Sequence, residues 1–177
     1  VSDVNGGSNT ATYTVNLTAA NDTPTLATPT AASFTDTSAS DTFSNTTGTL
    51  AGADRDSGQT LTYGISGGTV SGGTSTKAGS YGSLSVDTSS GAYTYTPNAT
   101  AINALTADTT DTFTVSVSDG NGGSNTATYT VNLTAANDTP TLTTPTAASY
   151  TDTTANDTFS NTTGTLAGAD RDSGQTL

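Results

Sequence analysis

The feature that most constrains this 177-residue chain is a long internal repeat. Residues 1–61 recur as residues 117–177, an offset of 116 residues, with only five mild differences. A repeat of this length holds a whole domain, because the rungs of solenoid proteins span only about 20–50 residues. We therefore expect modules arranged in tandem, with further copies beyond both ends.

Two copies of the segment NDTP, at 21–24 and 137–140, mark the expected boundaries between modules. Proline ends strand pairing and biases the preceding residue toward extended geometry. Residues 23–138 are then one complete module. Residues 1–22 carry the C-terminal strand of the preceding module, and residues 139–177 carry the N-terminal strands of the following one. On this division the chain is an excerpt from a longer array.

The residue types that are missing exclude several classes of function. The chain has no Cys, which excludes disulfides and thiolate metal sites, and no His, which excludes Ser–His and Cys–His pairs. Its formal net charge is −12, and only Arg55, Lys77 and Arg171 oppose 15 acidic residues, all Asp. Such a chain repels nucleic acid, and no apolar run approaches the ~20 residues of a membrane span. We expect no enzyme activity, no nucleic acid partner and no membrane insertion.

Alternation of apolar and polar residues predicts short β-strands, as where Leu61, Tyr63 and Ile65 flank Thr62 and Gly64. The predicted strands lie near 30–36, 46–53, 61–66, 84–86, 93–96, 113–117 and 129–133. Gly- and Ser-rich segments between them, including GISGGTVSGG at 64–73, predict turns, and residues 100–106 suggest one helical turn. About seven short strands with one polar face predict an all-β, Ig-like sandwich of two sheets.

Antiparallel succession of these strands would place the turns alternately at two ends of the sandwich, which we call poles. Asp54 and Asp56 follow the second predicted strand and Asp119 follows the sixth, so all three are expected at the N-terminal pole. The incoming linker residues Asn21 and Asp22 reach the same pole.

A second acidic group is expected at the C-terminal pole. Its members flank the first and sixth strands, lie in the outgoing linker or begin the following module: Asp36, Asp41, Asp108, Asp111, Asn137, Asp138, Asp170 and Asp172. Most aspartates are therefore expected where modules meet.

Clustered carboxylates repel one another, and a bound cation reverses the sign of that free energy. Calcium (Ca2+) takes six to eight oxygen ligands from carboxylates, amides and backbone carbonyls, which this chain supplies at both poles. Zinc and copper prefer the nitrogen and sulfur ligands that it lacks. The sequence therefore predicts calcium at the junctions between modules.

Asp and Asn are also common turn residues, because their side chains bond the local backbone. Asp87, in the turn DTSSG at 87–91, is expected to be only that. An EF-hand is not present, because the loop that starts at Asp119 has Thr130 at its twelfth position, where an acidic residue is needed.

Three segments carry a family resemblance. VSVSDGNGGSNTATYTVNLTAANDTP at 115–140 resembles the end of the VCBS repeats of bacterial RTX-type adhesins and, more distantly, of cadherin repeats. LAGADRDSGQTLTYGI at 50–65 is similar to a cadherin-like segment, and YGSLSVDTSSGAYTYTPNA at 81–99 fits the VCBS pattern. The resemblance extends over essentially the whole chain and implies a cadherin-like β-sandwich, extracellular or on the bacterial cell surface.

The resemblance also implies calcium ligands at matching positions. Asp54 and Asp56 match the cadherin Asp-x-Asp ligands, and Asp119 matches the aspartate after the sixth strand. The pairs Asn21-Asp22 and Asn137-Asp138 match the centre of the linker motif Asp-x-Asn-Asp-Asn.

The match to the cadherin ligands is incomplete. The linker motif has lost its outer residues, which are here Ala19, Thr23, Ala135 and Thr139. The chain has no Glu, so the cadherin Glu ligands would have to be replaced by Asp36, Asp108 or Asp111. A junction is then expected to hold fewer ions than a cadherin junction.

Three functions fit these features. The first is a structural extender, whose partners are the neighbouring repeats of the same chain and which calcium makes rigid. The second is an adhesive module that binds carbohydrate or another ligand, which would require exposed aromatic residues or a regular polar array. The third is a segment of an extracellular filament or biofilm matrix fibre, in which arrays also associate laterally.

Overall fold

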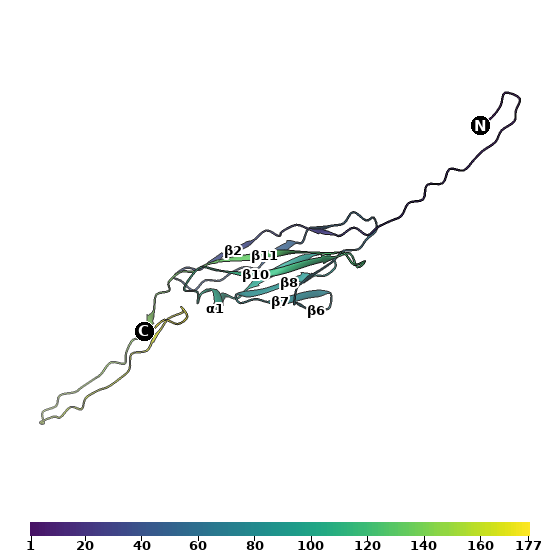
Figure 1. Ribbon diagram of the computed structural model, residues 1–177. Helices are drawn as coiled ribbons and strands as arrows, with labels where there is room; N and C mark the ends of the chain where they lie inside the picture. The colour runs from purple at the N-terminus through teal and green to yellow at the C-terminus, as the bar shows by residue number, and fades with distance from the viewer.

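The computed structural model describes residues 1–177 as a central β-sandwich with an extended segment at each end (Figure 1). One sheet has four strands in the order β2 (Ala32–Thr35), β11 (Ser124–Thr134), β10 (Thr109–Ser118) and β5 (Thr62–Ile65). The other has five strands in the order β3 (Thr46–Thr49), β9 (Ala92–Pro97), β8 (Gly82–Asp87), β7 (Thr74–Ala78) and β6 (Thr69–Ser71). The predicted all-β sandwich is confirmed.

Two short strand pairs begin the modules. They join β1 (Thr25–Leu26) to β4 (Gly52–Ala53), and β12 (Thr141–Leu142) to β13 (Gly168–Ala169). The two pairs consist of equivalent residues, 116 positions apart. The segment after the second linker therefore forms the same first strand pair as the complete module.

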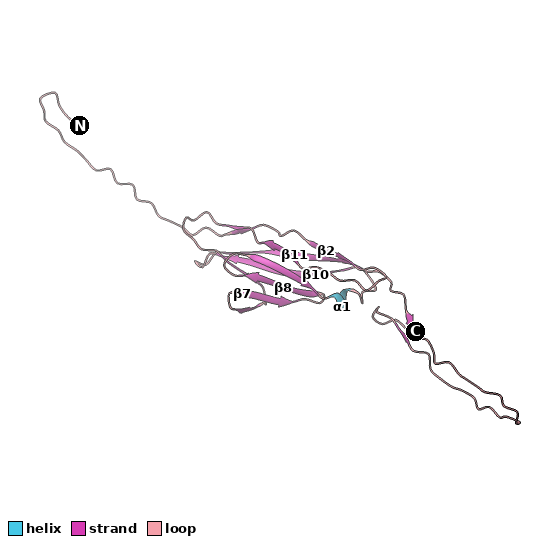
Figure 2. Ribbon diagram, turned by 180° about the vertical axis from the view of Figure 1, so that it is seen from behind, coloured by secondary structure: helices cyan, strands magenta, loops and turns pink.

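The long hairpin of β10 and β11 forms the centre of the four-stranded sheet (Figure 2). Its register places Phe113 opposite Tyr129, and β11 pairs in parallel with β2, where Leu133 lies opposite Phe34. These four side chains are buried, whereas threonines alternate with them on the outer face. The period-two pattern therefore sets which face of the sheet is inside.

Tyr95 of β9 joins the two sheets at the middle of the core. Its ring centroid lies 5.8 Å from that of Phe34, 6.0 Å from Phe113 and 6.3 Å from Tyr129, all in the opposite sheet. Leu84 and Val86 of β8 are fully buried beside it. The alternation in 84–86 and 93–96 therefore predicted correctly which face of these strands is buried.

The predicted number of seven strands was too low. The segment 64–73, predicted as a turn, contains β6, which pairs with β7. Every residue of β6 is exposed, so no alternation marks it. The strand predicted at 46–53 is divided into β3 and β4, which pair with different partners. The missed hairpin adds two strands, an even number, so the order of the poles is preserved.

A single helical turn, α1 (Ala99–Ile102), lies at the C-terminal pole near the expected position. The side chain of Asn98 accepts a hydrogen bond of 3.2 Å from the backbone N–H of Ala101, which caps the helix. Ile102 anchors the turn in the core with no exposed surface.

The N-terminal segment has the sequence of a core strand but no partner strands. Tyr13 and Leu17 are 89% and 90% exposed, whereas the equivalent Tyr129 and Leu133 are 1% and 2% exposed. The segment runs away from the sandwich as an extended chain (Figure 1). Burial of this strand therefore depends on the rest of its module.

Candidate functional site at the repeat junctions

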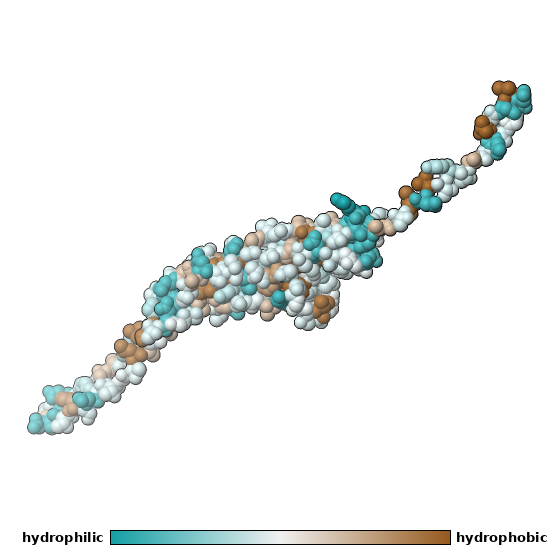
Figure 3. All heavy atoms as spheres, viewed as in Figure 1, coloured by the Kyte–Doolittle hydropathy of each residue, from teal (hydrophilic) through white to brown (hydrophobic).

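Three segments meet at the N-terminal pole: the linker, the loop between β4 and β5, and the β10–β11 turn. The backbone N–H of Asp22 donates to Oδ2 of Asp56 at 2.7 Å, and the Asn21 amide donates to Oδ2 of Asp119 at 2.8 Å. Hydrophilic side chains gather at this end of the sandwich, where the N-terminal segment joins it (Figure 3). The structure thus brings together the residues that the strand order placed at this pole.

Asp119 is held by its own turn as well as by the linker. Its Oδ1 accepts from the backbone N–H groups of Asn121 at 2.7 Å and Gly123 at 2.9 Å. Gly suits position 123, because a Cβ there would collide with the Asp119 carboxylate as this turn holds it. The hydrogen bond from Asn21, with those from the turn, holds the pKa of Asp119 below its usual range despite burial.

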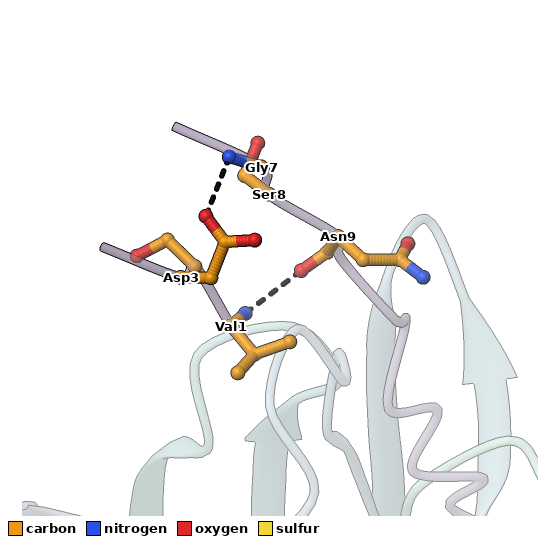
Figure 4. Close-up of a pocket in the computed structure, with 6 residues that line it drawn as sticks. Val1, Asp3, Gly7, Ser8 and Asn9 are labelled. Carbon is orange, nitrogen blue, oxygen red and sulfur yellow. Dashed lines mark hydrogen bonds between the residues drawn. The ribbon is translucent and has the colours of Figure 1, made fainter. Parts of the chain in front are cut away.

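The same turn forms alone in the N-terminal segment (Figure 4). There Oδ1 of Asp3 accepts from the N–H groups of Asn5 at 2.9 Å and Gly7 at 2.8 Å. The sequence DxNGG or DGNGG therefore encodes this geometry locally, whereas the bond to the linker requires the folded module.

Asp54 and Asp56 sit in a loop tied down by an Asx turn, in which Oδ1 of Asp54 accepts from the N–H of Asp56 at 2.8 Å. The other oxygen of Asp54, Oδ2, is buried with no hydrogen-bond donor. Gln59, which the sequence reading did not select, joins the segments. Its amide donates to Oδ1 of Asn21 at 2.9 Å and accepts from the Asn121 side chain at 2.6 Å.

The second junction has the same contacts between linker and Asp-x-Asp loop as the first, and it also contacts the C-terminal pole of the complete module. The N–H of Asp138 donates to Oδ2 of Asp172 at 2.8 Å, as Asp22 does to Asp56. Oδ1 of Asp170 accepts from the N–H of Asp172 at 2.9 Å, as in the first copy. The Asn137 amide donates to the carbonyl of Asp138 at 2.8 Å.

Asp36, at the end of β2, brings a further buried carboxylate to this junction. Its Oδ2 accepts weakly from the N–H of Ala136 at 3.4 Å, and its Oδ1 has no donor. Burial, reinforced by the charges of Asp138 and Asp41, raises the pKa of Asp36 above its ordinary value. An ionised Asp36 is thus an unfavourable group in the absence of a cation.

Arg171, between the two aspartates of the following module, is the main residue that the sequence reading missed. Its Nη2 lies 2.7 Å from Oδ1 of Asp138, and its Nε lies 3.0 Å from Oδ2. The hydrogen bonds from Arg171 hold the pKa of Asp138 below its usual range. No local pattern could have signalled this contact, because it joins residues 33 positions apart.

The remaining candidates have local roles. Oδ1 of Asp108 accepts from the N–H of Ala135 at 2.8 Å, close to the outgoing linker. Asp111 does not join the junction group: its side chain faces inward from β10 and accepts from the N–H of Tyr81 at 3.1 Å, which fixes the β7–β8 turn. Oδ1 of Asp87 accepts from the hydroxyls and N–H groups of two serines in its own turn.

The donor set suits a hard cation, although the carboxylates are not gathered around one point. Three carboxylate oxygens at the poles are buried without a donor: Asp36 Oδ1, Asp54 Oδ2 and Asp172 Oδ1. Such atoms carry an uncompensated desolvation cost that calcium would remove. No three acidic side chains lie close enough together to hold one metal ion as they stand. Shared coordination would therefore require side chains to move toward one another.

Comparison with known proteins places the chain in a family. A search of curated proteins gave no match. The one helix, α1, is four residues long, and no helix here could cross a membrane. Bacterial cadherin-like domains match residues 21–135, close to the expected module 23–138. Domains of this kind are adhesion-related repeats, typically non-catalytic and usually extracellular or on the cell surface. The chain belongs to the family of bacterial cadherin-like domains.

Proposed function

We propose that the chain is an extender segment of a large, secreted or surface-bound RTX-type adhesin with VCBS-like repeats. Residues 23–138 are the repeating unit, and the neighbouring repeats are its partners. The observation that carries this proposal is the repeated bond from the linker aspartate to the second aspartate of the next Asp-x-Asp loop. Each linker is thereby held by the repeat that follows it, as a spacer requires.

Calcium is the cation proposed for the junctions. At the first junction the residues that would hold it are Asn21, Asp22, Asp54, Asp56 and Asp119. At the second they are Asn137, Asp138, Asp170 and Asp172, with Asp36 and Asp108 from the complete module. Bound calcium would supply positive charge to the buried oxygens and remove the repulsion between carboxylates.

The burial of the aromatic residues favours the extender over a carbohydrate-binding module. Sugar binding would require exposed aromatic side chains on which a sugar ring could stack. In the complete module Phe34, Tyr93, Tyr95, Phe113 and Tyr129 are all at most 9% exposed. The outer face of the four-stranded sheet carries mainly threonines instead.

Small-angle X-ray scattering on an array of four complete repeats tests the proposal. The array should become longer and stiffer in millimolar calcium than in chelator. The double substitution Asp54→Ala, Asp56→Ala in every repeat should abolish the response, and Asp87→Ala in every repeat is the control with an equivalent loss of a turn aspartate. An array with the same maximum dimension and flexibility in both conditions would show that calcium does not stiffen it.

A further inference from the structure

We propose that the arginine of each Asp-Arg-Asp loop is a built-in cation that fastens its repeat to the preceding one. The guanidinium of Arg171 binds both oxygens of Asp138 in a fork, at 2.7 and 3.0 Å. Its Nη2 also donates to the backbone carbonyl of Ser38 at 3.0 Å. One side chain of the following repeat therefore contacts the linker and the β2–β3 loop of the complete module.

The linker carboxylate is enclosed in this contact. The side chain of Asp138 has no exposed surface, whereas that of Arg171 is 40% exposed. Paired charge-assisted hydrogen bonds to a buried carboxylate are strong and directional, and only Arg offers the fork that they need. The contact therefore fixes the orientation of the linker and adds more than net charge.

A second contact crosses the same junction without a charged group. The backbone N–H of Ser173 donates to the carbonyl of Ala104, just beyond α1, at 3.2 Å. The Asp-Arg-Asp-Ser loop is thus attached to the preceding pole at two places, Ser38 and Ala104. Both attachments are direct hydrogen bonds between protein groups.

The first junction shows the same loop without a preceding pole. Asp22 bonds to Asp56 as Asp138 bonds to Asp172, so the loop geometry is shared. Arg55 is nevertheless exposed and makes no ion pair, and Asp22 is exposed as well. The pairing of arginine with the linker carboxylate therefore coincides with the presence of the preceding repeat.

Arg171 and calcium would act on the same carboxylate. This step rests on the proposed function, which assigns Asp138 to the calcium site; the fastening itself does not. The guanidinium uses one lone pair of each Asp138 oxygen and places a positive charge beside both of them, so calcium bound by Asp138 has to overcome repulsion from the arginine or displace it. Arginine then holds the junction when calcium is scarce and lowers the calcium affinity of the linker.

The test measures the spread of distances across the junction in the 177-residue chain. Because the chain has no Cys, spin labels can be attached at Thr112→Cys on β10 and Thr144→Cys after the linker. Pulsed electron paramagnetic resonance then gives the distribution of distances between the two labels. In chelator the distribution should be clearly broader for Arg171→Ala than for the parent chain, and calcium should narrow that of the parent further. Arg171→Lys should broaden it as well, because lysine lacks the fork.

Lys77→Ala is the matched control, because it removes the same charge from a residue that bonds within its own module, to the Ser66 carbonyl. It should leave the distribution unchanged. Calcium titration by calorimetry should give an affinity several-fold higher for Arg171→Ala than for the parent or Lys77→Ala. Distributions of equal width for Arg171→Ala and the parent in chelator overturn the fastening. A broadened distribution with no calcium binding to either chain retains the fastening and rejects the calcium proposal.

Discussion

Replacing Asp36 by Asn should stabilise the calcium-free protein, although Asp36 is among the proposed calcium ligands. Asp36 is 2% exposed, its Oδ1 has no donor, and its neighbours Asp41 and Asp138 are also acidic. An amide at this position removes one of three like charges and offers N–H donors to the Asp41 carboxylate. The substitution therefore replaces repulsion by a hydrogen bond.

The size of the effect follows from the unpaired oxygen. A buried polar atom without a partner costs about 1–3 kcal/mol. Taking the lower half of that range, and a shift of roughly 4 °C per kcal/mol for a module of this size, we expect Asp36→Asn to raise Tm by roughly 4–8 °C in chelator at pH 7. The gain should be smaller in saturating calcium, because the cation already relieves the repulsion in the parent chain.

The pH dependence gives an independent check of the sign. Because the folded-state pKa of Asp36 is raised, the folded protein binds this proton more tightly than the unfolded chain. The destabilisation is fully present above the raised pKa and is relieved as the pH falls through it toward 3.8. The difference in Tm between Asp36→Asn and the parent should therefore shrink over that window.

Thermal melts in chelator at pH 7 and at lower pH, followed by circular dichroism, measure both effects. Asp152→Asn is the control, because Asp152 is the equivalent residue of the following segment and is exposed. A lower Tm for Asp36→Asn in chelator at pH 7, with Asp152→Asn unchanged, would refute the reasoning, since Asp36 would then be a favourable group when ionised.

Three further predictions concern stability. Calcium at 100-fold excess over its dissociation constant should stabilise the folded state by about 2.7 kcal/mol per site, and an equal Tm in calcium and chelator would contradict the calcium proposal. Tyr95→Phe and Tyr129→Phe should each raise the free energy of unfolding by about 1 kcal/mol in urea melts, because both hydroxyls are buried without a hydrogen-bond partner. Tyr81→Phe, at a half-buried position, is the control. A lower free energy of unfolding for Tyr95→Phe or Tyr129→Phe would show that the hydroxyl does have a hydrogen-bond partner. Gly82→Ala should lower stability by about 1–3 kcal/mol, because its Cβ would collide with the Tyr95 hydroxyl, whereas Gly164→Ala, with open space around it, should be neutral.

The sequence predicted the sandwich because burial follows alternation in most strands. Phe113, Tyr129 and Tyr95 all lie on the face that the pattern assigned to the core. The β6–β7 hairpin escaped prediction because β6 is exposed throughout and lies between pairs of glycines, so neither alternation nor composition distinguishes it from a turn. The placement of the poles survived this error only because the missed strands came as a pair.

The junction was predictable in its membership but not in its contacts. Strand order alone was enough to bring Asp22, Asp56 and Asp119 to one pole. Gln59 and Arg171 could not be selected, because their roles depend on side chains that reach across segments far apart in the sequence. The prediction for Asp111 did not anticipate its orientation: the residue lies near the pole, but the alternation in β10 turns its side chain inward, where it accepts from the N–H of Tyr81.

Charge balance leaves room for the proposed calcium beside arginine at one junction. At the second junction a single guanidinium is paired with Asp138, while Asp36 and Asp172 each retain a buried oxygen without a donor. One positive charge therefore cannot satisfy the carboxylates gathered there, and an excess of negative charge remains for a divalent cation. The arginine fixes the linker in a direction, and the cation would supply the rest of the charge. On the two proposals together, arginine would keep neighbouring repeats oriented without calcium, and calcium would add stiffness.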